Sequence, residues 1–160
     1  MRLTPIILGS LVALGLLSYV AVREYTGQVG EFASAPLIIE TERGPVQFTV
    51  EMAVTKQQWE RGLMFRKSIA PDAGMLFDLG DEKRVSLWMK NTLIPLDMIF
   101  IRANSTIVQI AANATPLSTD LVSSSRPVRA VLEIAGGRAA ELGIKPGDHA
   151  VHAIFGNAPK

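Results

Sequence analysis

The amino-acid sequence predicts a mainly β (α+β) fold: a small barrel-like domain of seven or eight short strands with two short helices, behind one N-terminal transmembrane helix. Three observations support this prediction. Residues 5–22 form an uncharged, strongly apolar run. After this run, short apolar segments alternate with turn-forming glycine, proline, asparagine and aspartate. Only two short stretches carry helix signals, which is too few for a parallel sheet with crossover helices.

The uncharged run is long enough to cross a membrane. As a helix, its 18 residues would extend about 27 Å, close to the thickness of the hydrocarbon core of a bilayer. Arg2 precedes it and Arg23 follows it, so the charges only slightly favour an amino terminus in the cytoplasm. We therefore expect residues 1–24 to form a single-pass anchor in the inner (cytoplasmic) membrane. The anchor would contact lipid through residues 5–22 and leave the globular domain on the periplasmic side.

A cleaved signal sequence is the alternative. Ala33-Ser34-Ala35 has the small residues of a cleavage site, although it lies 13 residues beyond Val22. Cleavage there would leave a soluble periplasmic domain. Residues 25–36, which are mostly small and polar, are expected to form a tether, and residues 37–160 the β-rich globular domain.

The charge balance argues against a nucleic-acid partner. The 160 residues contain 16 Lys and Arg and 15 Asp and Glu, a net charge of +1. Arg2, Arg23 and Glu24 precede residue 31, which leaves 14 basic and 14 acidic residues in the part from 31 to 160. Proteins that bind nucleic acid usually carry a clustered basic excess, so we expect no such partner.

The first helix is predicted by its two ends. Thr55 and Gln58 have the spacing of a capping box, in which the threonine oxygen accepts a backbone N–H and the glutamine reaches back. Gly62 tolerates the left-handed backbone that ends a helix, so the helix should run to about Arg61. A second short helix is expected at 138–142, directly after two glycines.

The strands are predicted from apolar runs between turn residues. Residues 46–52 alternate apolar and polar side chains, which is the period of a half-buried strand. The turn composition at 42–45 makes this strand the second arm of a hairpin. Residues 113–127 have little periodicity and are expected to form a long loop. The predicted strands cover residues 37–39, 46–52, 75–77, 85–89, 96–102, 106–112, 128–134 and 149–154.

Several strings in this part of the chain resemble one protein family. They are GLMFR (62–66), GMLFDL (74–79), WMKNTLIPLDMIF (88–100), VLEIAGG (131–137) and GD (147–148). In this order they are similar to domain-of-unknown-function family 192, and the resemblance covers about residues 37–155. It implies a small β-rich domain, often placed behind an N-terminal signal or anchor. The family has no established biochemical activity, so the resemblance implies a fold and leaves the function open.

The string from Trp88 to Thr92 is the first candidate site. On a strand, Trp88, Lys90 and Thr92 would share one face. A cation beside a large aromatic ring, with Asn91 and Thr92 as hydrogen-bonding groups, suits a carboxylate, a phosphate or a sugar. In the alternative interpretation Trp88 fills the barrel and Lys90 pairs with Asp97, while Asn91 and Thr92 close a turn.

Charged residues elsewhere could join this site. Arg66 follows an apolar triplet and could clamp an anion or pair with Glu133. Glu133 lies in the apolar run VLEIA, so its carboxylate must be paired or face solvent. One hypothesis leaves Glu133 facing solvent; the other is a shared pocket of Arg66, Lys90, Asn91, Asp97 and Glu133. All candidate ligand-binding residues are Arg66, Trp88, Lys90, Asn91, Thr92, Asp97 and Glu133.

No residue pattern predicts catalysis, a metal site or a cofactor. The chain has no cysteine, which excludes disulfides, thiolate catalysis and cysteine-based metal sites. His149 and His152 are three residues apart and would face opposite sides of a strand. No G-x-S-x-G or phosphate-binding-loop motif is present. The remaining enzyme hypothesis is a hydrolase that uses Asp97 and Glu133, if the fold brings the two carboxylates together.

The function expected first is non-catalytic. The anchor and the neutral domain suit an accessory or structural subunit, or an interaction domain, of a membrane protein complex such as a respiratory or photosynthetic assembly. The alternative is a cell-envelope domain that binds a small ligand or glycan through Lys90, Asn91 and Thr92. A subunit should co-purify with a larger complex in mild detergent, whereas this ligand binder should lose binding on Lys90→Ala.

Overall fold

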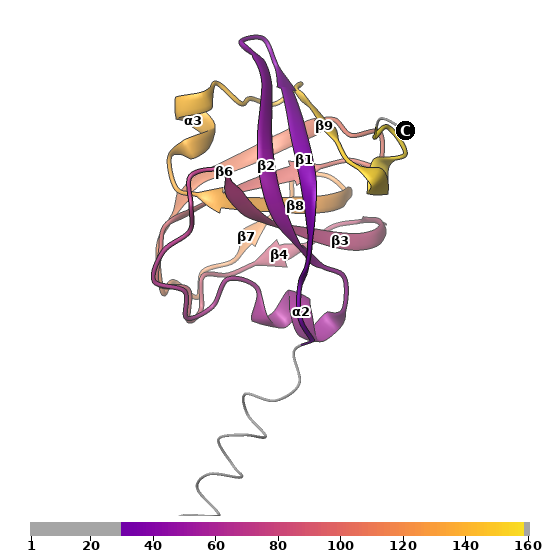
Figure 1. The fold of residues 1–160 in the computed structure, drawn as a ribbon. Helices are drawn as coiled ribbons and strands as arrows, with labels where there is room; N and C mark the ends of the chain where they lie inside the picture. The colour runs from indigo at the N-terminus through magenta and orange to yellow at the C-terminus, as the bar shows by residue number, and fades with distance from the viewer. Residues whose placement is uncertain (1–29, 159–160) are drawn as a thin grey trace, which may run out of the picture. The chain divides into compact units, whose positions relative to one another are not determined.

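Seven strands form one curved sheet, a half-barrel, in the computed structural model, which describes residues 30–158 (Figure 1). With two short strands outside this sheet, the described residues form β1 (Ala33–Thr41), β2 (Gly44–Ala53), β3 (Ala73–Lys83), β4 (Ser86–Leu87), β5 (Leu96–Ile101), β6 (Ile107–Ala114), β7 (Val122–Ser123), β8 (Val128–Ala135) and β9 (His149–Val151). The helices are α2 (Lys56–Arg61), α3 (Arg138–Leu142) and the 3-10 turn η1 (Ala153–Phe155). The sheet order is β6-β5-β8-β3-β2-β1-β9, and β4 pairs separately with β7. The mainly β fold with two short α-helices is thus confirmed.

The predicted hairpin and the first helix are both present. β1 and β2 pair antiparallel, with the turn between them inside the segment 42–45 where the sequence predicts one. At α2, the Thr55 Oγ1 accepts the Gln58 backbone N–H at 3.3 Å, and the Gln58 Oε1 accepts the Thr55 N–H at 3.1 Å. Gly62 ends the helix with a φ of 45°. α2 then connects β2 to β3, which run parallel, so the sheet contains one crossover that the sequence does not predict.

Replacing Thr55 by alanine should lower the free energy of unfolding by about 1 kcal/mol, because an N-cap hydroxyl typically contributes that much. Gln58 keeps its own bond to the Thr55 N–H in this variant, so the double variant Thr55→Ala/Gln58→Ala should lose more. Urea denaturation of both variants measures the two effects. If the Thr55→Ala midpoint matches that of the unchanged protein, the capping box does not stabilise α2.

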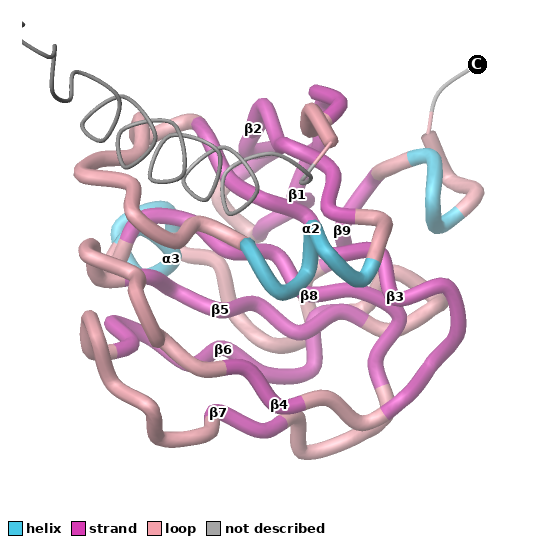
Figure 2. The backbone as a smooth tube through the Cα atoms, turned by 90° about the horizontal axis from the view of Figure 1, so that it is seen from below, coloured by secondary structure: helices cyan, strands magenta, loops and turns pink. Residues whose placement is uncertain are grey.

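The middle of the sheet is buried on both faces. An inner cluster fills the curve of the half-barrel and draws on strands from both edges of the sheet, such as Ala150 of β9 and Ile107 of β6. An outer cluster includes Phe77 and Met98 and is covered by α2, β4 and β7. Figure 2 views the domain from the end at which α2 lies. All six residues of β5 are buried because both of its faces are covered.

The two edges of the sheet approach each other next to β6 and β9. A bridge joins Thr106, just before β6, to His149 of β9. The N–H of Ile107 also donates to the Asp148 carbonyl at 2.9 Å. Because β6 and β9 are the outermost strands, these bonds hold the two edges of the half-barrel together at this point.

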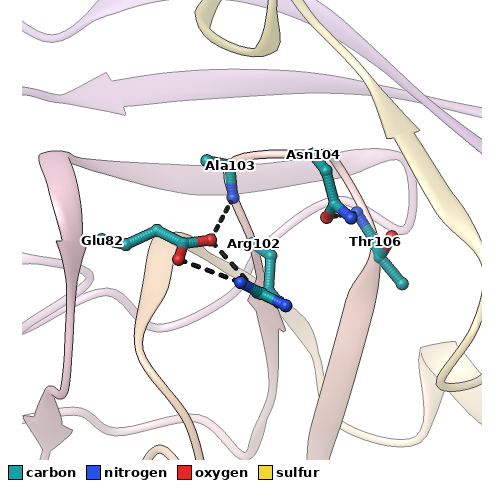
Figure 3. A network of polar contacts seen from close by, with 5 residues as sticks. All are labelled: Glu82, Arg102, Ala103, Asn104 and Thr106. Carbon is teal, nitrogen blue, oxygen red and sulfur yellow. Dashed lines mark hydrogen bonds and ion pairs between the residues drawn. The ribbon is translucent and has the colours of Figure 1, made fainter.

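β3 is longer than the sequence predicts. The strand predicted at 75–77 is part of a strand that continues past Gly80, a turn-forming residue, to Lys83, with a shift in its pairing to β8. Glu82 holds this continuation: its carboxylate accepts two bonds from the Arg102 guanidinium, both 3.2 Å long, and one from the Ala103 N–H at 2.8 Å (Figure 3). A tertiary contact to the turn after β5 therefore overrides the local turn signal.

Two further predictions are corrected. The strand predicted at 85–89 is reduced to the two residues of β4, because the chain then turns: the Thr92 N–H donates to the Met89 carbonyl at 3.0 Å. The segment 113–127 is not wholly a loop. Its residues Val122 and Ser123 form β7, which pairs with β4.

The ends of the described part also differ from the prediction. β1 begins at Ala33, so residues 33–36 pair with β2 and do not belong to a tether. The last strand stops at Val151, and η1 follows it. The predicted anchor at 1–24 lies outside the described residues. Between residues 30 and 158, no helix is long and apolar enough to cross a bilayer.

Candidate functional site

A cavity of about 440 Å³ opens on the outer face of the sheet. It lies between α2, the end of β3, β4 and the residues after β4, over the outer face of β8. Both tryptophans of the chain, Trp59 and Trp88, line it. A cavity of this volume is large enough for a small molecule. We call it the Glu133 pocket after the acidic residue on its floor.

Glu133 reaches the floor of the pocket from the middle of β8. Its neighbours across the two adjoining strands are Met75 of β3 and Met98 of β5, and both are fully buried. The Glu133 side chain is itself only 5% exposed. Within residues 30–158, no ion pair or hydrogen bond joins its carboxyl group to another residue. The carboxyl oxygens keep contact with the cavity, because no fully enclosed side-chain oxygen of this part lacks a hydrogen-bond partner. The carboxyl group is therefore oriented towards the pocket.

Burial determines the protonation of this group. Removal from water disfavours the carboxylate and raises the pKa of Glu133 to about 8. At neutral pH the group therefore holds its proton for most of the time. A protonated carboxyl group donates one hydrogen bond and can also accept one. The floor of the pocket thus offers a neutral donor and acceptor in apolar surroundings.

Two cations at the mouth of the pocket form cation–π contacts with aromatic rings. The Lys83 ammonium lies 5.0 Å from the centre of the Trp59 ring, and the Arg61 guanidinium lies 4.8 Å from that of Phe65. Arg61 and Lys83 line the pocket, and neither forms an ion pair within residues 30–158. An anionic group at the mouth would therefore meet two positive charges that no ion pair within the described residues neutralises, while Glu60 of the same lining pairs with Lys56.

The sequence-predicted site is only partly assembled. Of the seven candidate residues, Trp88, Thr92 and Glu133 line the same pocket. Their common face does not arise from a strand, because β4 ends at Leu87. Trp88 is 47% exposed and so does not fill the barrel. Lys90 is exposed and lies 5.2 Å from the centre of the Trp88 ring, so it does not pair with Asp97.

Arg66 and Asn91 also lie outside the pocket lining. Arg66 pairs with Glu51 of β2 through both terminal guanidinium nitrogens, and therefore does not bind Glu133. Asn91 takes the left-handed backbone of a turn, with a φ of 57°, and its carbonyl accepts the Phe65 N–H at 2.8 Å. Both residues position the loops beside the pocket.

Asp97 is a structural residue on the other face of the sheet. It pairs across β5 and β8 with Ile134, the residue next to Glu133, so the two carboxyl groups point to opposite faces. The Asp97 carboxylate accepts the backbone N–H groups of Asn113, Gly137 and Ala139 at 2.8, 2.9 and 2.8 Å. The shared five-residue pocket is therefore not formed, and a hydrolase that pairs Asp97 with Glu133 has no geometric basis.

Sequence reasoning missed the part of the pocket that α2 contributes. Lys56, Trp59 and Glu60 share one helix face by their spacing of three and four residues, and all three line the cavity. That spacing was visible in the sequence. What it could not show is that this face lies over Glu133, because the contact depends on the parallel crossover from β2 to β3.

No cation site is apparent in the described part of the chain. Between residues 30 and 158, no three His, Asp or Glu side chains are grouped so that they could hold a metal ion. His149 and His152 do not approach a common point: the His149 Nδ1 lies 3.3 Å from the Ser105 hydroxyl, whereas the His152 Nδ1 accepts the Ile154 N–H.

The fold and the site define a class of protein: a small half-barrel β domain with a pocket of ligand size above a buried carboxyl group. The particular family follows from sequence. The model of DUF192, described as Uncharacterized ACR, matches residues 38–152, so this chain belongs to domain-of-unknown-function family 192. No curated protein matches the chain.

Two solved structures are similar to this protein. One is a protein from Sinorhizobium meliloti 1021, described as a proposed transcription regulator, with 43% identity and a TM-score of 0.76 over 79% of this chain and 99% of that one. The other is a protein of unknown function from Novosphingobium aromaticivorans DSM 12444, with 39% identity and a TM-score of 0.73 over 74% and 85% of the two chains. The first relative consists almost wholly of the matched domain. A fragment of residues 30–160 is therefore expected to fold by itself.

Proposed function

We propose that this domain binds a small amphipathic ligand in the Glu133 pocket. The ligand has an apolar body that fills the cavity and an anionic head that meets Arg61 and Lys83 at the mouth. The observation that carries the proposal is the unpartnered, buried carboxyl group of Glu133 on the floor of a cavity of ligand size.

The position of Glu133 favours a ligand over a structural role. A buried carboxyl group without a protein partner lowers the stability of the fold, and an apolar side chain would pack better between Met75 and Met98. Departures of this kind are typical of functional positions, where binding needs a group that folding alone would disfavour. The protonated group can donate to an oxygen atom of a ligand, such as a carbonyl or a hydroxyl.

Decane-1-sulfonate, used below its micelle concentration, is a suitable probe because its head stays anionic at all relevant pH values. Both tryptophans line the pocket, so binding should change the intrinsic fluorescence of the 30–160 fragment. An apolar ligand excludes water from Glu133 and disfavours its charged form, so affinity should be about tenfold weaker at pH 9 than at pH 6. Glu133→Gln should bind with no such pH dependence.

The matched control is Lys90→Ala. Lys90 does not line the cavity, so this variant should bind the probe as the unchanged protein does, whereas a site centred on Lys90 would lose it. An unchanged tryptophan signal would contradict the proposal. So would an equal pH dependence in the unchanged protein and in Glu133→Gln.

The membrane anchoring and orientation of this domain are a second part of the proposal. A single anchor over residues 5–22, with the domain on the periplasmic side, is supported by the length and lack of charge of that run. Alkaline phosphatase fused after residue 160 should be active in a bacterial host if this orientation is correct, and inactive if the domain faces the cytoplasm.

An accessory subunit of a membrane complex is the second candidate function. Exposed large apolar side chains such as Leu117 and Leu121 favour it, because such groups commonly mark an interaction surface. In that case, stoichiometric membrane partners should co-purify with the full-length protein in mild detergent. A nucleic-acid partner, which the description of the Sinorhizobium relative would suggest, has little support here because residues 31–160 carry equal numbers of basic and acidic side chains.

A further inference from the structure

Five exposed apolar side chains belong to three loops beside the Glu133 pocket, and two of them, Trp88 and Leu121, line it. Backbone hydrogen bonds join the three loops that carry them: the Phe65 N–H donates to the Asn91 carbonyl at 2.8 Å, and the Leu117 N–H to the Thr92 carbonyl at 3.0 Å. Exposure of these side chains ranges from 43% to 65%. We call them the apolar rim: Phe65, Trp88, Leu93, Leu117 and Leu121.

Two residues of the apolar rim have an unfavourable backbone conformation. Phe65 and Leu117 both have a φ of 64°, in the left-handed region that bulky side chains rarely adopt. Neither side chain gains burial within the described domain in return, since Phe65 is 47% and Leu117 59% exposed. Backbone strain of this kind persists at functional sites, where it holds a side chain in the position that binding requires. Here it holds two apolar side chains towards solvent.

The loops around the apolar rim are positively charged although the domain as a whole is neutral. Residues 61–67 contain Arg61, Arg66 and Lys67, and residues 88–93 contain Lys90, with no acidic residue in either segment. Of these four cations, only Arg66 forms an ion pair within the described residues. The remaining loop, 115–121, adds one acidic residue. Aromatic and leucine side chains among unpaired cations are typical of surfaces that insert into an anionic bilayer.

The chain enters the domain beside the same surface. The Gln58 side-chain amide of α2 donates to the Glu31 carbonyl at 3.4 Å, and Phe32 packs against the outer cluster with Trp59. Only eight residues separate Val22, the end of the uncharged run, from Glu31. Such a segment reaches at most about 30 Å, so an anchor at 5–22 would hold the point where the chain enters the domain within that distance of the lipid.

We infer that the apolar rim docks on the surface of an anionic lipid bilayer, with its apolar side chains in the interface and its cations at the lipid phosphates. The inference does not depend on the proposed ligand. It adds a second lipid contact to the one expected through residues 5–22. It also places the mouth of the Glu133 pocket at the membrane surface.

Vesicle flotation of the 30–160 fragment tests this inference without the anchor. The fragment should float with vesicles of phosphatidylcholine and phosphatidylglycerol, and float less with phosphatidylcholine alone or at high salt. Phe65→Asn and Leu117→Asn should each weaken binding by about tenfold or more, because each removes one inserted apolar side chain. Asparagine tolerates the left-handed backbone, so the urea midpoints of these variants should stay the same or rise.

Two further variants separate the outcomes. Arg43→Gln removes a cation at the β1–β2 turn, at the end of the domain opposite α2, and should leave flotation unchanged (Figure 1). Glu133→Gln should also float normally, so failure of the ligand proposal would not affect this test. A folded fragment that floats with neither kind of vesicle would overturn the inference and favour a protein partner for the apolar rim. Flotation that survives both asparagine variants would overturn it as well.

Discussion

Glutamine in place of Glu133 is expected to raise the free energy of unfolding by about 4 kcal/mol at pH 8. Burial raises the pKa of Glu133 to about 8 in the folded domain, from an ordinary value of 4.5. Between these two pH values the folded protein retains a proton that the unfolded chain has released. The stability of the domain therefore falls as the pH rises through this window. Below about pH 4.5 both states hold the proton and this penalty is absent.

Urea denaturation of the 30–160 fragment at pH 5, 6, 7 and 8 measures this effect. The unchanged protein should lose stability across the series relative to Glu133→Gln. Glu82→Gln is a matched control of opposite sign: hydrogen bonds from Arg102 and from the Ala103 N–H lower the pKa of the Glu82 carboxyl. Its contribution is present above the ordinary carboxyl pKa and is lost as the pH falls. Parallel profiles for the unchanged protein and Glu133→Gln would mean that Glu133 is hydrated.

Alanine in place of Asp97 is expected to destabilise the domain by about 3–5 kcal/mol. Asp97 is fully buried, and its two oxygens accept three backbone N–H groups. Two of these donors, Gly137 and Ala139, belong to the first turn of α3, which has no side-chain cap of its own. The variant leaves all three donors without an acceptor and removes the anion from the helix start.

The same denaturation assay measures this loss, and amide exchange locates it. Exchange at Ala139 and Asn113 should accelerate more than exchange in β1, because only the former amides lose their acceptor. Asp120→Ala, at an exposed aspartate, is the matched control and should change stability by less than about 0.5 kcal/mol. A cost of under about 1 kcal/mol for Asp97→Ala would show that water replaces the carboxylate.

Elements with local signals were predicted well. The capping box at Thr55 and Gln58 and the glycine at 62 place both ends of α2, since each is a contact within one turn of the chain. α3 begins and ends where the sequence indicates. The hairpin turn after β1 is equally local. These features depend on residues close in sequence, so no tertiary contact is needed to predict them.

Elements that depend on distant partners were not predictable. Gly80 and its neighbours have the composition of a turn, and only the Arg102 contact to Glu82 shows why β3 continues. The parallel pairing of β2 and β3 leaves no signal in either strand, although it places α2 over the outer face of the sheet. The apolar residues at 85–89 resemble a strand because three of them, Val85, Leu87 and Met89, pack in the outer cluster, although β4 covers only residues 86–87.

The candidate site divides in the same way. Glu133 stood out as a carboxylate in an apolar run, and its face of β8 follows from the period of a strand. Its lack of a partner, and the placement of Asp97 on the opposite face, depend on the register of β5 against β8, which no local pattern reveals. The ion pair between Arg66 and Glu51 was missed for the same reason. The sequence suggested an anion or Glu133 as the partner of Arg66, and no local pattern indicated Glu51.

The most direct test of the ligand proposal is the titration of Glu133 itself. The ¹³C chemical shift of its side-chain carboxyl carbon can be followed by NMR from pH 4 to 10 in the 30–160 fragment, with and without decane-1-sulfonate. We expect a midpoint near 8 without the probe and a rise of at least about one unit with it, because an apolar ligand excludes water from the carboxyl group. A midpoint near 4.5, or one that the probe does not move, would contradict a ligand site above Glu133.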